Sequence, residues 1–447
     1  MVVSVSAAIA CFLHFPAIDQ IWSSPIKAIF SSLLLAAALL IFHYRERLPR
    51  IARLAVFACL ALVIAAAGLQ AIHLVEMRAR TVPEWDVRVF WIYGQLMAKG
   101  ENVYALEPYQ KFYQELQPSR DFIEAVLQVG GEYPPPTMLL FRPLGYCTMP
   151  QAFLYWYIFL GLTVLVAIVL LRHTFLKRDG PWGLALILLL LFALGGTWET
   201  IRFGQTSFLT LIFLLLYWLD REHPRAGVWI VLGAIVKPYM AILLFDALWN
   251  KQWRAAIWCA VTGVVMSAAS LLLLGPRTFI SYFTLDPPGR VPRWVYMEWV
   301  NQSLLATILR LSHAPVAHSP AANPIFLMSV LVLFLTTAWL VVRAGRETTL
   351  SLCLWLLLGL MIYPGTLAHY SVMLLPILLL LWQTREKIPL GVFGCTALVT
   401  VVIALVGFHA EAFAAYFVTW IALAGLAITA RPEGHAIWMV EGYPTAG

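Results

Sequence analysis

The sequence predicts an all-α polytopic membrane protein, and three observations lead to this prediction. Of its 447 residues, 61% are hydrophobic and only 12% are charged, a balance typical of membrane proteins and not of soluble globular ones. The hydrophobic residues gather in runs near the roughly 20 residues that an α-helix needs to cross a bilayer. Short clusters of Arg and Lys separate these runs. Within lipid each run must be helical, because no other open structure satisfies its own backbone hydrogen bonds.

We expect about 12 transmembrane helices. Their approximate positions are 2–19, 26–43, 54–75, 151–171, 181–197, 205–219, 254–274, 323–343, 348–364, 367–383, 388–407 and 411–430. The first run has no basic region ahead of its apolar part, so we interpret it as a span and not as a cleaved signal peptide. The whole chain, residues 1–447, is then expected to form one integral membrane domain.

The basic clusters predict which ends of these helices face the cytoplasm, since Lys and Arg accumulate in cytoplasmic loops. The clusters are Arg45 to Arg53, Arg172 to Arg178, Arg221 with Arg225, Lys251 with Arg254, Arg343 with Arg346, and Arg385 with Lys387. When all of them are placed inside, the alternation of spans holds with one exception. The net charge of +7 thus reflects topology and does not indicate a nucleic-acid partner.

The exception is the segment 226–249, which has basic residues at both ends. Two half-helices that meet near Lys237 and Pro238 would keep both ends inside, and a proline suits such a break. One ordinary span with a misplaced charge is the alternative. Lys237 itself is costly in lipid and should face a cavity or a partner. A cytoplasmic cavity, or pairing with an acid such as Asp246, competes with a substrate role for this lysine.

With this orientation two long loops lie outside, at residues 76–150 and 275–322. Loops of this length in a compact protein are usually functional. Two short turns, 197–205 and 364–370, are expected on the same side. The stretch 137–146 follows three prolines and is too short to cross, so we expect it to be a re-entrant or interfacial helix.

Asp86 is the candidate general base of the first outer loop. It lies between Trp85 and Val87, close to the membrane face that the run 54–75 reaches. Partial desolvation there would raise its pKa toward the range useful to a base. A solvated loop aspartate is the alternative interpretation.

Further polar groups are expected on the same outer side as Asp86. They are Arg88, Tyr133, Arg142, Arg202, Gln205, Asn301, Gln302, Arg310 and His369. This mixture suits a reaction with a phosphorylated lipid, in which arginines hold a phosphate, amides and a tyrosine bind a sugar, and a carboxylate takes a proton.

Several of these residues have a plainer interpretation. Arg142 and Arg202 could extend to lipid head groups, and His369 could be a structural histidine at the start of a helix. Asn301 fits the glycosylation sequon, and it could also cap the run 303–311.

Nucleotide and metal chemistry lack their usual signals. The sequence contains no P-loop and no glycine-rich dinucleotide loop, and no DxD motif of the kind that binds cations and nucleotide sugars. His313 and His318 are five residues apart, which is a poor metal pair, and the six cysteines form no CxxC pair. The missing DxD motif favours a sugar donor activated by lipid phosphate. No cofactor and no metal ligands are predicted, and the metal requirement is left open.

Six stretches, in order along the chain, resemble a known family. They are Asp86 with WIYGQLMAKGENVY from Trp91, EYPPPTMLLFRPL from Glu132, FGQTSFLTLIFLLLYWL from Phe203, AGVWIVLGAIVKPY from Ala226, WVNQSLLATILRL from Trp299, and YPGTLAHYSVMLLP from Tyr363. With these stretches the sequence resembles the polyprenyl-phosphate-sugar-dependent glycosyltransferases of family 87, in the GT-C superfamily of multi-span enzymes.

The resemblance implies a GT-C-type fold in a bacterial inner membrane, with the active site facing the periplasm. Asp86 matches the first-loop acid of the family, which implies a catalytic base, and His369 matches a histidine near the site. Gln205, Lys237, Asn301, Gln302 and Arg310 match motif positions. The family often has Ser-Pro ahead of its late histidine, where this chain has Tyr-Pro-Gly-Thr at 363–366, which leaves donor and acceptor preference open.

The predicted function is inverting transfer of a sugar, most simply a mannose-like hexose, from a polyprenyl-phosphate donor to a glycolipid or polysaccharide acceptor. Membrane lipids are the remaining partners. A flippase or other transporter of lipid-linked sugars is the alternative, suggested by Lys237 and the broken segment. A transporter should carry its polar groups at the midplane along a path open to both sides, whereas here they crowd the outer face.

Overall fold

The computed structural model confirms an all-α protein. It describes residues 25–80, 86–105, 107–109, 111, 133–284, 295–296, 298, 300–312, 323–345, 349–386, 390–407 and 413–429. Within these ranges the only β-type pairing outside the helices is one isolated bridge between Asn301 and Leu367. The first predicted span, 2–19, lies outside the described residues.

Four helices are long and apolar enough to cross a membrane: α4 (Arg50–Arg80), α9 (Met149–Phe175), α15 (Trp253–Leu274) and α19 (Pro324–Ala344). Their apolar side chains are largely exposed, as with Leu162 and Leu165 on α9 and Leu331 and Leu335 on α19. Exposed apolar faces of this size mark contact with lipid or protein, and on helices of this length lipid is the natural neighbour. The chain is a multi-pass membrane protein, and the total of 12 spans stays a prediction.

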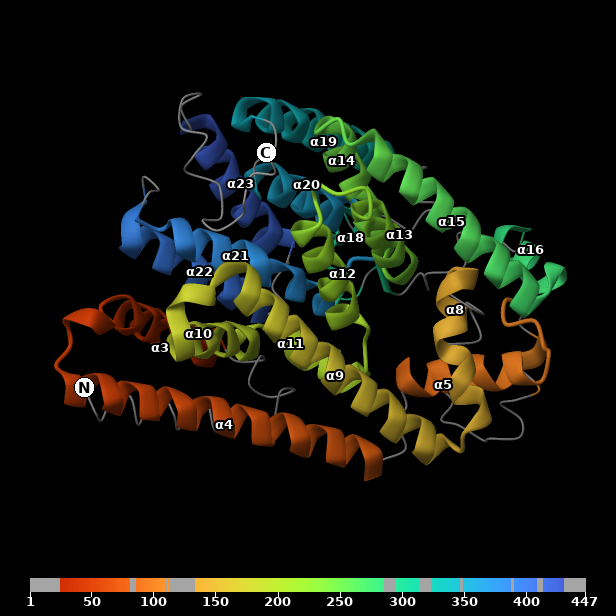
Figure 1. The fold of residues 1–447 in the computed structure, drawn as a ribbon, viewed down its shortest axis with the longest axis horizontal. Coiled ribbons are helices and arrows are strands. Elements are labelled where there is room, and N and C mark those ends of the chain that lie inside the picture. Colours follow the sequence, from red (N-terminus) through yellow and green to blue (C-terminus); the bar gives the residue numbers. More distant parts are fainter. Residues whose placement is uncertain are drawn as a thin grey trace.

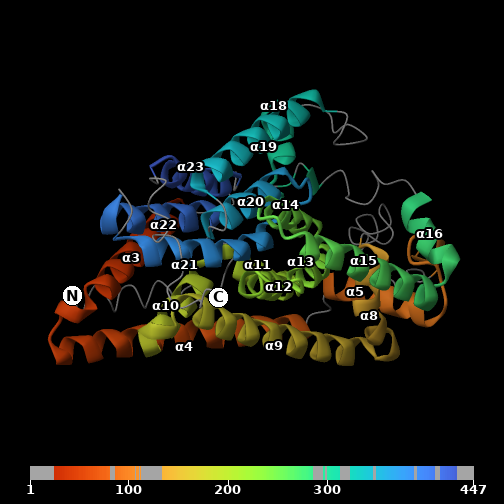
Figure 2. The same cartoon turned by 45° about the horizontal axis from the view of Figure 1, so that its top comes forward.

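Shorter helices fill the space between these four. They are α3 (Pro25–His43), α10 (Gly180–Ala193), α11 (Gly195–Phe203), α12 (Ser207–Leu219), α13 (Ala226–Val236), α14 (Leu243–Trp249), α20 (Thr349–Ile362), α21 (Leu374–Thr384), α22 (Gly391–Gly407) and α23 (Phe413–Thr429). Nearly every side chain of α20 and α21 is buried. A helix that is apolar on all sides belongs in the interior of the bundle, and Figure 2 shows both between α19 and α10.

One end of the molecule is built from the first and second predicted outer loops. There α5 (Asp86–Ala98), α8 (Pro135–Phe141) and α16 (Pro276–Thr284) gather beside the start of α9 and the end of α15, at the right of Figure 1. The stretch 137–146 is helical as expected, in α8 and the 3-10 helix η2 (Arg142–Tyr146). Of the second loop, α16 and α18 (Leu304–Ser312) are described.

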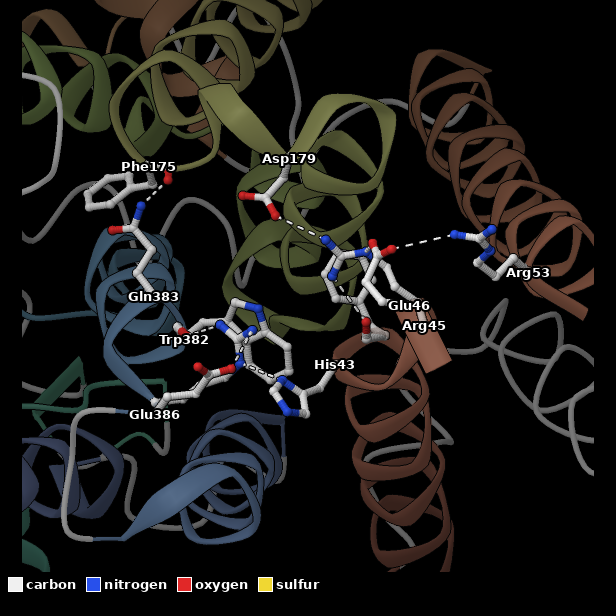
Figure 3. A network of polar contacts seen from close by, with 11 residues as sticks. His43, Arg45, Glu46, Arg53, Phe175, Asp179, Trp382, Gln383 and Glu386 are labelled. Atoms are coloured by element: carbon white, nitrogen blue, oxygen red, sulfur yellow. Dashed lines mark hydrogen bonds and ion pairs between the residues drawn. The ribbon is translucent and has the colours of Figure 1, made fainter. Parts of the chain in front are cut away.

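The opposite end brings together three of the basic clusters that we placed inside (Figure 3). Arg45 donates to Asp179 over 3.2 Å, and Arg385 donates through Nε to Nδ1 of His43 over 2.8 Å. Gln383 donates to the carbonyl of Phe175. The ends of α3, α9 and α21 are therefore neighbours, which is compatible with placing their basic clusters on one side of the membrane.

The helix predicted at 181–197 differs from the structure, and so does the turn predicted at 197–205. Helix α10 ends at Ala193, and α11 continues after a 69° bend as far as Phe203, so the predicted turn is mostly helical and that prediction is wrong. The bend falls at a Gly-Gly pair. A Cβ on Gly196 would lie 2.1 Å from Oγ of Ser371, so glycine allows α11 to approach the 3-10 helix η7 (Ala368–Met373) closely.

The break near Lys237 is confirmed. Helix α13 ends at Val236, Lys237 is extended at φ −142° and ψ 109°, and the 3-10 helix η4 (Pro238–Ile242) leads into α14. The chain also reverses there. Lys237 contacts Gln205 ahead of α12, whereas Asp246 on α14 pairs with Arg221 beyond the other end of α12. Both ends of the segment therefore lie at the same end of α12, which excludes a single straight span.

Candidate active site

Four segments that are distant in sequence meet at the outer-loop end of the bundle. Asp86 is the first residue of α5, Gln205 lies in the turn between α11 and α12, Lys237 is the residue at the break, and His369 lies in η7. All four were predicted site residues. The packing of α11 and α12 against η7 and of α5 against α9 holds these segments together.

A chain of side-chain hydrogen bonds joins three of them. Lys237 donates through Nζ to Oε1 of Gln205 over 3.0 Å, and Gln205 donates through Nε2 to Oδ2 of Asp86. Lys237 and Gln205 are buried and Asp86 is half-buried. The suggested pairing of Lys237 with Asp246 is wrong, because the Asp246 carboxylate is occupied by Arg221 and Tyr217.

Aromatic rings surround the ammonium group of Lys237. It lies 4.5 Å from the ring centroid of Tyr370 and 5.6 Å from that of Tyr133, distances at which a cation is attracted to a ring face. Tyr239 and Tyr363 extend the cluster, with centroids 5.2 Å and 6.4 Å from that of Tyr370. Sequence reasoning selected Tyr133 and missed the other three tyrosines, although each lies within a family-like stretch beside Lys237 or His369.

The environment of Asp86 acts on its pKa in opposite directions. Burial raises the pKa of the carboxyl above its ordinary value, and the hydrogen bond from Gln205 and the charge of Lys237 lower it to a smaller extent. The net direction is upward, as predicted. A carboxylate with a raised pKa is a stronger proton acceptor while it stays ionised near neutral pH.

Glycine at 204 allows Gln205 to reach Asp86. Gly204 ends α11 at φ +70°, and a Cβ there would lie 2.1 Å from Cγ2 of Val87. Its carbonyl accepts a hydrogen bond from Nε1 of Trp156 over 2.7 Å. The turn thus packs directly against the first residues of α5 and is anchored to α9.

Backbone pairing between two loops positions His369. The amide of Gln302 donates to the carbonyl of Thr366 over 2.7 Å, and the amide of Ala368 donates to the carbonyl of Val300 over 2.8 Å. The side chain of Asn301 donates through Nδ2 to the carbonyl of Pro364 over 2.9 Å. This arrangement sets the start of η7, where the His369 side chain is buried.

The two interpretations of Asn301 are both revised. Its side chain is fully buried, so it is not available as a glycosylation acceptor in this fold. Ser303 caps α18, because its Oγ accepts from the amide of Ala306 over 3.2 Å, while Asn301 accepts from the amide of Ser303. Asn301 therefore has a structural role beside the cap.

Gln302 and His369 are two of several buried side chains whose polar atoms are not satisfied by the described part of the protein. Both amide atoms of Gln302 and Nε2 of His369 lack a hydrogen-bond partner within the described ranges. Buried polar groups are usually paired. These atoms are therefore suited to a ligand that brings its own donors and acceptors.

The predicted arginines do not form one cluster. Arg310 donates to the carbonyls of Glu298 and Asn301 over 2.8 and 3.0 Å and so holds the 298–301 loop. Arg142 donates to the carbonyl of Leu273 over 3.4 Å at the end of α15. Arg202 is half-buried, three residues before Gln205, and lies over the ring of Phe203. Arg88 is buried on α5, two residues after Asp86.

Metal ligation was left open by the sequence. Among the described residues, no group of three or more His, Cys, Asp or Glu side chains could hold a metal ion. The hydrogen-bonded group at the centre of the site consists of the Asp86 carboxylate, the Gln205 amide and the Lys237 ammonium group.

Comparison with known proteins identifies the family. Residues 132–368 match Glycosyltransferase family 87. The chain is 29% identical over 288 residues to an alpha-(1->3)-arabinofuranosyltransferase of Mycobacterium tuberculosis (strain CDC 1551 / Oshkosh), which covers 59% of this chain and 62% of the relative. It is 24% identical over 348 residues to a polyprenol-phosphate-mannose-dependent alpha-(1-2)-phosphatidylinositol mannoside mannosyltransferase of M. tuberculosis (strain ATCC 25618 / H37Rv), which covers 68% of this chain and 78% of that protein.

The matched region spans less than two thirds of the length of the arabinofuranosyltransferase, and no solved structure matches the chain. The family match itself extends over more than half of the chain and contains Tyr133, Gln205, Lys237, Asn301 and Gln302. The chain belongs to glycosyltransferase family 87.

Proposed function

We propose that the protein transfers a sugar from a polyprenyl-phosphate donor to a lipid or polysaccharide acceptor, with inversion at the anomeric carbon and Asp86 as the general base. The observation that carries the proposal is the half-buried Asp86 carboxylate, held by Gln205 beside the buried Lys237. The two relatives named above are glycosyltransferases, and one is named as dependent on polyprenol-phosphate-mannose.

The reaction is a single displacement. Asp86 takes the proton from the acceptor hydroxyl as its oxygen attacks the anomeric carbon, and the bond from that carbon to the lipid phosphate breaks on the opposite face. The departing phosphate carries negative charge that needs a cation or hydrogen-bond donors. Arg88, Arg202 and the imidazole of His369 are our candidates for this role.

The binding of sugar and acceptor is assigned to the groups around this centre. The unsatisfied amide of Gln302 suits a sugar hydroxyl, and the faces of Tyr133 and Tyr363 suit its apolar side. Arg142, Asn301 and Arg310 are assigned indirect roles, because each holds a neighbouring loop or helix end. The prenyl chain would remain in lipid along the exposed apolar helices.

We place this site on the periplasmic face of a bacterial inner membrane, within a single domain whose first outer loop, 76–150, carries Asp86. The basic ends of α3, α9 and α21 lie at the other end of the molecule, which supports this orientation through the positive-inside rule. Attachment of an impermeant thiol reagent to a cysteine introduced at Gln151, in intact cells whose protein also carries Cys147→Ser because Cys147 is a free and only half-buried thiol, would test it. Labelling only after the membrane is opened would contradict the orientation.

A donor screen tests the activity. Purified protein in detergent would be supplied with polyprenyl-phosphate mannose or polyprenyl-phosphate arabinofuranose and a glycolipid acceptor, and the products would be separated by mass. We expect transfer from the mannose donor, since that relative is matched over the larger share of both chains. Transfer from the arabinose donor alone would support the proposed enzyme class and contradict the proposed donor sugar.

The transporter alternative makes a different prediction in the same assay. A flippase has no product in detergent, where there are no two compartments, so absence of transfer from every lipid-linked donor would contradict the proposed function. The hydrogen bond from Lys237 to Gln205, which in turn donates to Asp86, supports the enzyme.

A further inference from the structure

We infer that Gln205 and Lys237 are positioning residues that fix the orientation and ionisation of Asp86 and do not bind the sugar donor. The inference rests on the proposed function, because it assigns them a role in the action of Asp86 as a base. It changes the expectation from the sequence, which grouped both residues with the substrate-binding side chains.

The chemistry of the three groups allows one arrangement only. A lysine ammonium group donates hydrogen bonds and accepts none, so it must face the oxygen of the Gln205 amide. The amide nitrogen then faces Asp86 and can only donate, so Oδ2 of Asp86 must carry no proton. A proton on Asp86 can therefore reside on Oδ1 only.

Oδ1 is the oxygen left available for the reaction. Among the described residues, Gln205 supplies the hydrogen bond to Oδ2 and no residue supplies one to Oδ1. Asp86 is also the first residue of a 13-residue helix, where the positive end of the helix dipole favours a carboxylate. The acceptor hydroxyl would thus meet a carboxylate whose Oδ2 is held by Gln205 and whose Oδ1 receives no hydrogen bond from the described residues.

Several contacts hold Lys237 beside Gln205. The lysine follows the last residue of α13, at a helix C-terminus where a positive charge is favoured. Thr137 on α8 donates through its hydroxyl to the carbonyl of Ile235 and so ties the first outer loop to the break. The ammonium group lies over the rings of Tyr370 and Tyr133, which makes burial of the charge less costly.

Lys237 is the charged group that acts on the pKa of Asp86. The elements beside Asp86 carry further charged or titratable groups, namely Arg88 on α5 itself, Glu199 and Arg202 on α11, and His369 on η7. Among all of these groups, Lys237 is the one connected to Asp86 through a described hydrogen-bonded bridge. Its charge reaches the carboxylate through an oriented amide, so removal of the charge should weaken the ionised form of Asp86.

The test is the pH dependence of kcat in detergent, measured for full-length enzyme with saturating polyprenyl-phosphate mannose. The acid limb is the part of the profile in which kcat falls as the pH decreases and Asp86 becomes protonated. In Lys237→Met the ammonium charge is lost, so the midpoint of the acid limb should move upward by about one pH unit. The rate should recover at higher pH, with an unchanged KM for the donor. Lys237→Arg keeps the charge and should return the limb most of the way toward wild type.

Gln205→Glu tests the bridge itself with almost no change in size. It replaces the donor toward Asp86 by a second carboxylate, and two carboxylates that share a site raise one of their pKa values strongly. The acid limb should again move upward by about one unit or more. Gln151→Glu is the matched control, because Gln151 is exposed at the start of α9 and a glutamate serves that helix cap equally well. Its profile should match wild type.

The outcomes separate this inference from the proposed function. A Lys237→Met enzyme with a raised donor KM and an unmoved acid limb would show that the lysine binds the donor, which would overturn the inference. Wild-type profiles for both Lys237→Met and Gln205→Glu would overturn it as well. If Lys237→Met does not elute as a single species in size-exclusion chromatography, Gln205→Glu and Lys237→Arg carry the test. Near wild-type turnover by Asp86→Asn would instead remove the proposed base, whatever these profiles show.

Discussion

The buried carboxylate of Asp246 should be one of the strongest single contributors to stability in the bundle. Asp246 on α14 is fully buried. It accepts hydrogen bonds from Nε and Nη2 of Arg221 over 2.9 and 2.7 Å, from the Tyr217 hydroxyl over 2.6 Å and from the Ser351 hydroxyl over 3.2 Å. These contacts attach the end of the broken segment 226–249 to α12 and to the central helix α20. We predict that Asp246→Asn loosens this attachment.

The magnitude follows from the burial of both partners. The Arg221 side chain is only 12% exposed, and removal of one partner of a buried ion pair costs about 3–5 kcal/mol. At roughly 2.1 cal/mol/K of unfolding entropy per residue, 447 residues give a fall in Tm of about 3–5 °C. The assay is thermal unfolding in detergent, followed by tryptophan fluorescence.

An ion pair with both side chains exposed provides the control. Arg53 lies 3.4 Å from Glu46, and the two side chains are 38% and 69% exposed, so Arg53→Gln should cost at most about 1 kcal/mol and about 1 °C. The double variant Arg221→Met with Asp246→Leu should recover much of the lost stability, because no unpaired charge remains. If Asp246→Asn and Arg53→Gln unfold at the same temperature, the reasoning from the buried pair is refuted.

Three further predictions concern the candidate site. Gly204→Ala should lower Tm and transfer activity, because φ +70° alone costs an L-residue about 1–2 kcal/mol and its Cβ would overlap Val87. Gly100→Ala, at φ +74° in open space, should show the conformational cost alone. Equal Tm values for the two variants would contradict the overlap with Val87. Asn301→Ala removes two hydrogen bonds beside His369, at about 1 kcal/mol each, and should reduce transfer. Asn323→Ala, which removes a cap of α19, should leave the rate unchanged, and equal rates for the two variants would count against the loop pairing. Because burial raises the pKa of Asp86, kcat should fall as the pH decreases through a value above the usual one near 4, whereas a rate that stays flat below pH 4 would argue against an ionised Asp86.

Much of the fold could be predicted from composition and charge. Apolar runs of span length have a single structural solution in lipid, so the long helices α4, α9, α15 and α19 lie where the sequence places them. The conflict between basic residues at both ends of 226–249 required a break, and the break falls at Lys237. The sequence gives no local sign of the bend at Gly195 and Gly196, and Ser371, which limits the space beside Gly196, lies far along the chain.

The sequence indicated which residues belong to the site better than it indicated what each residue does there. Asp86 and Gln205 were both selected, but their direct hydrogen bond depends on how the α11–α12 turn packs against α5, which no local pattern reveals. Arg142 and Arg310 were grouped with them because they lie in outer loops, and the structure uses both to hold backbone carbonyls. Pairing of Lys237 with Asp246 was one of the possibilities that the sequence left open, and the structure pairs Lys237 with Gln205 and Asp246 with Arg221 instead.

The central claim is that Asp86 is the general base of a lipid-phosphate-dependent sugar transfer. The most direct test is the rate of transfer by purified Asp86→Asn beside wild type in detergent, at saturating donor and acceptor, with both proteins shown to elute alike. The substitution keeps the size of the side chain and removes its ability to take a proton. We predict a loss of about 10²–10⁴-fold in kcat with an unchanged Tm to within about 2 °C. A rate within a few-fold of wild type would contradict the account.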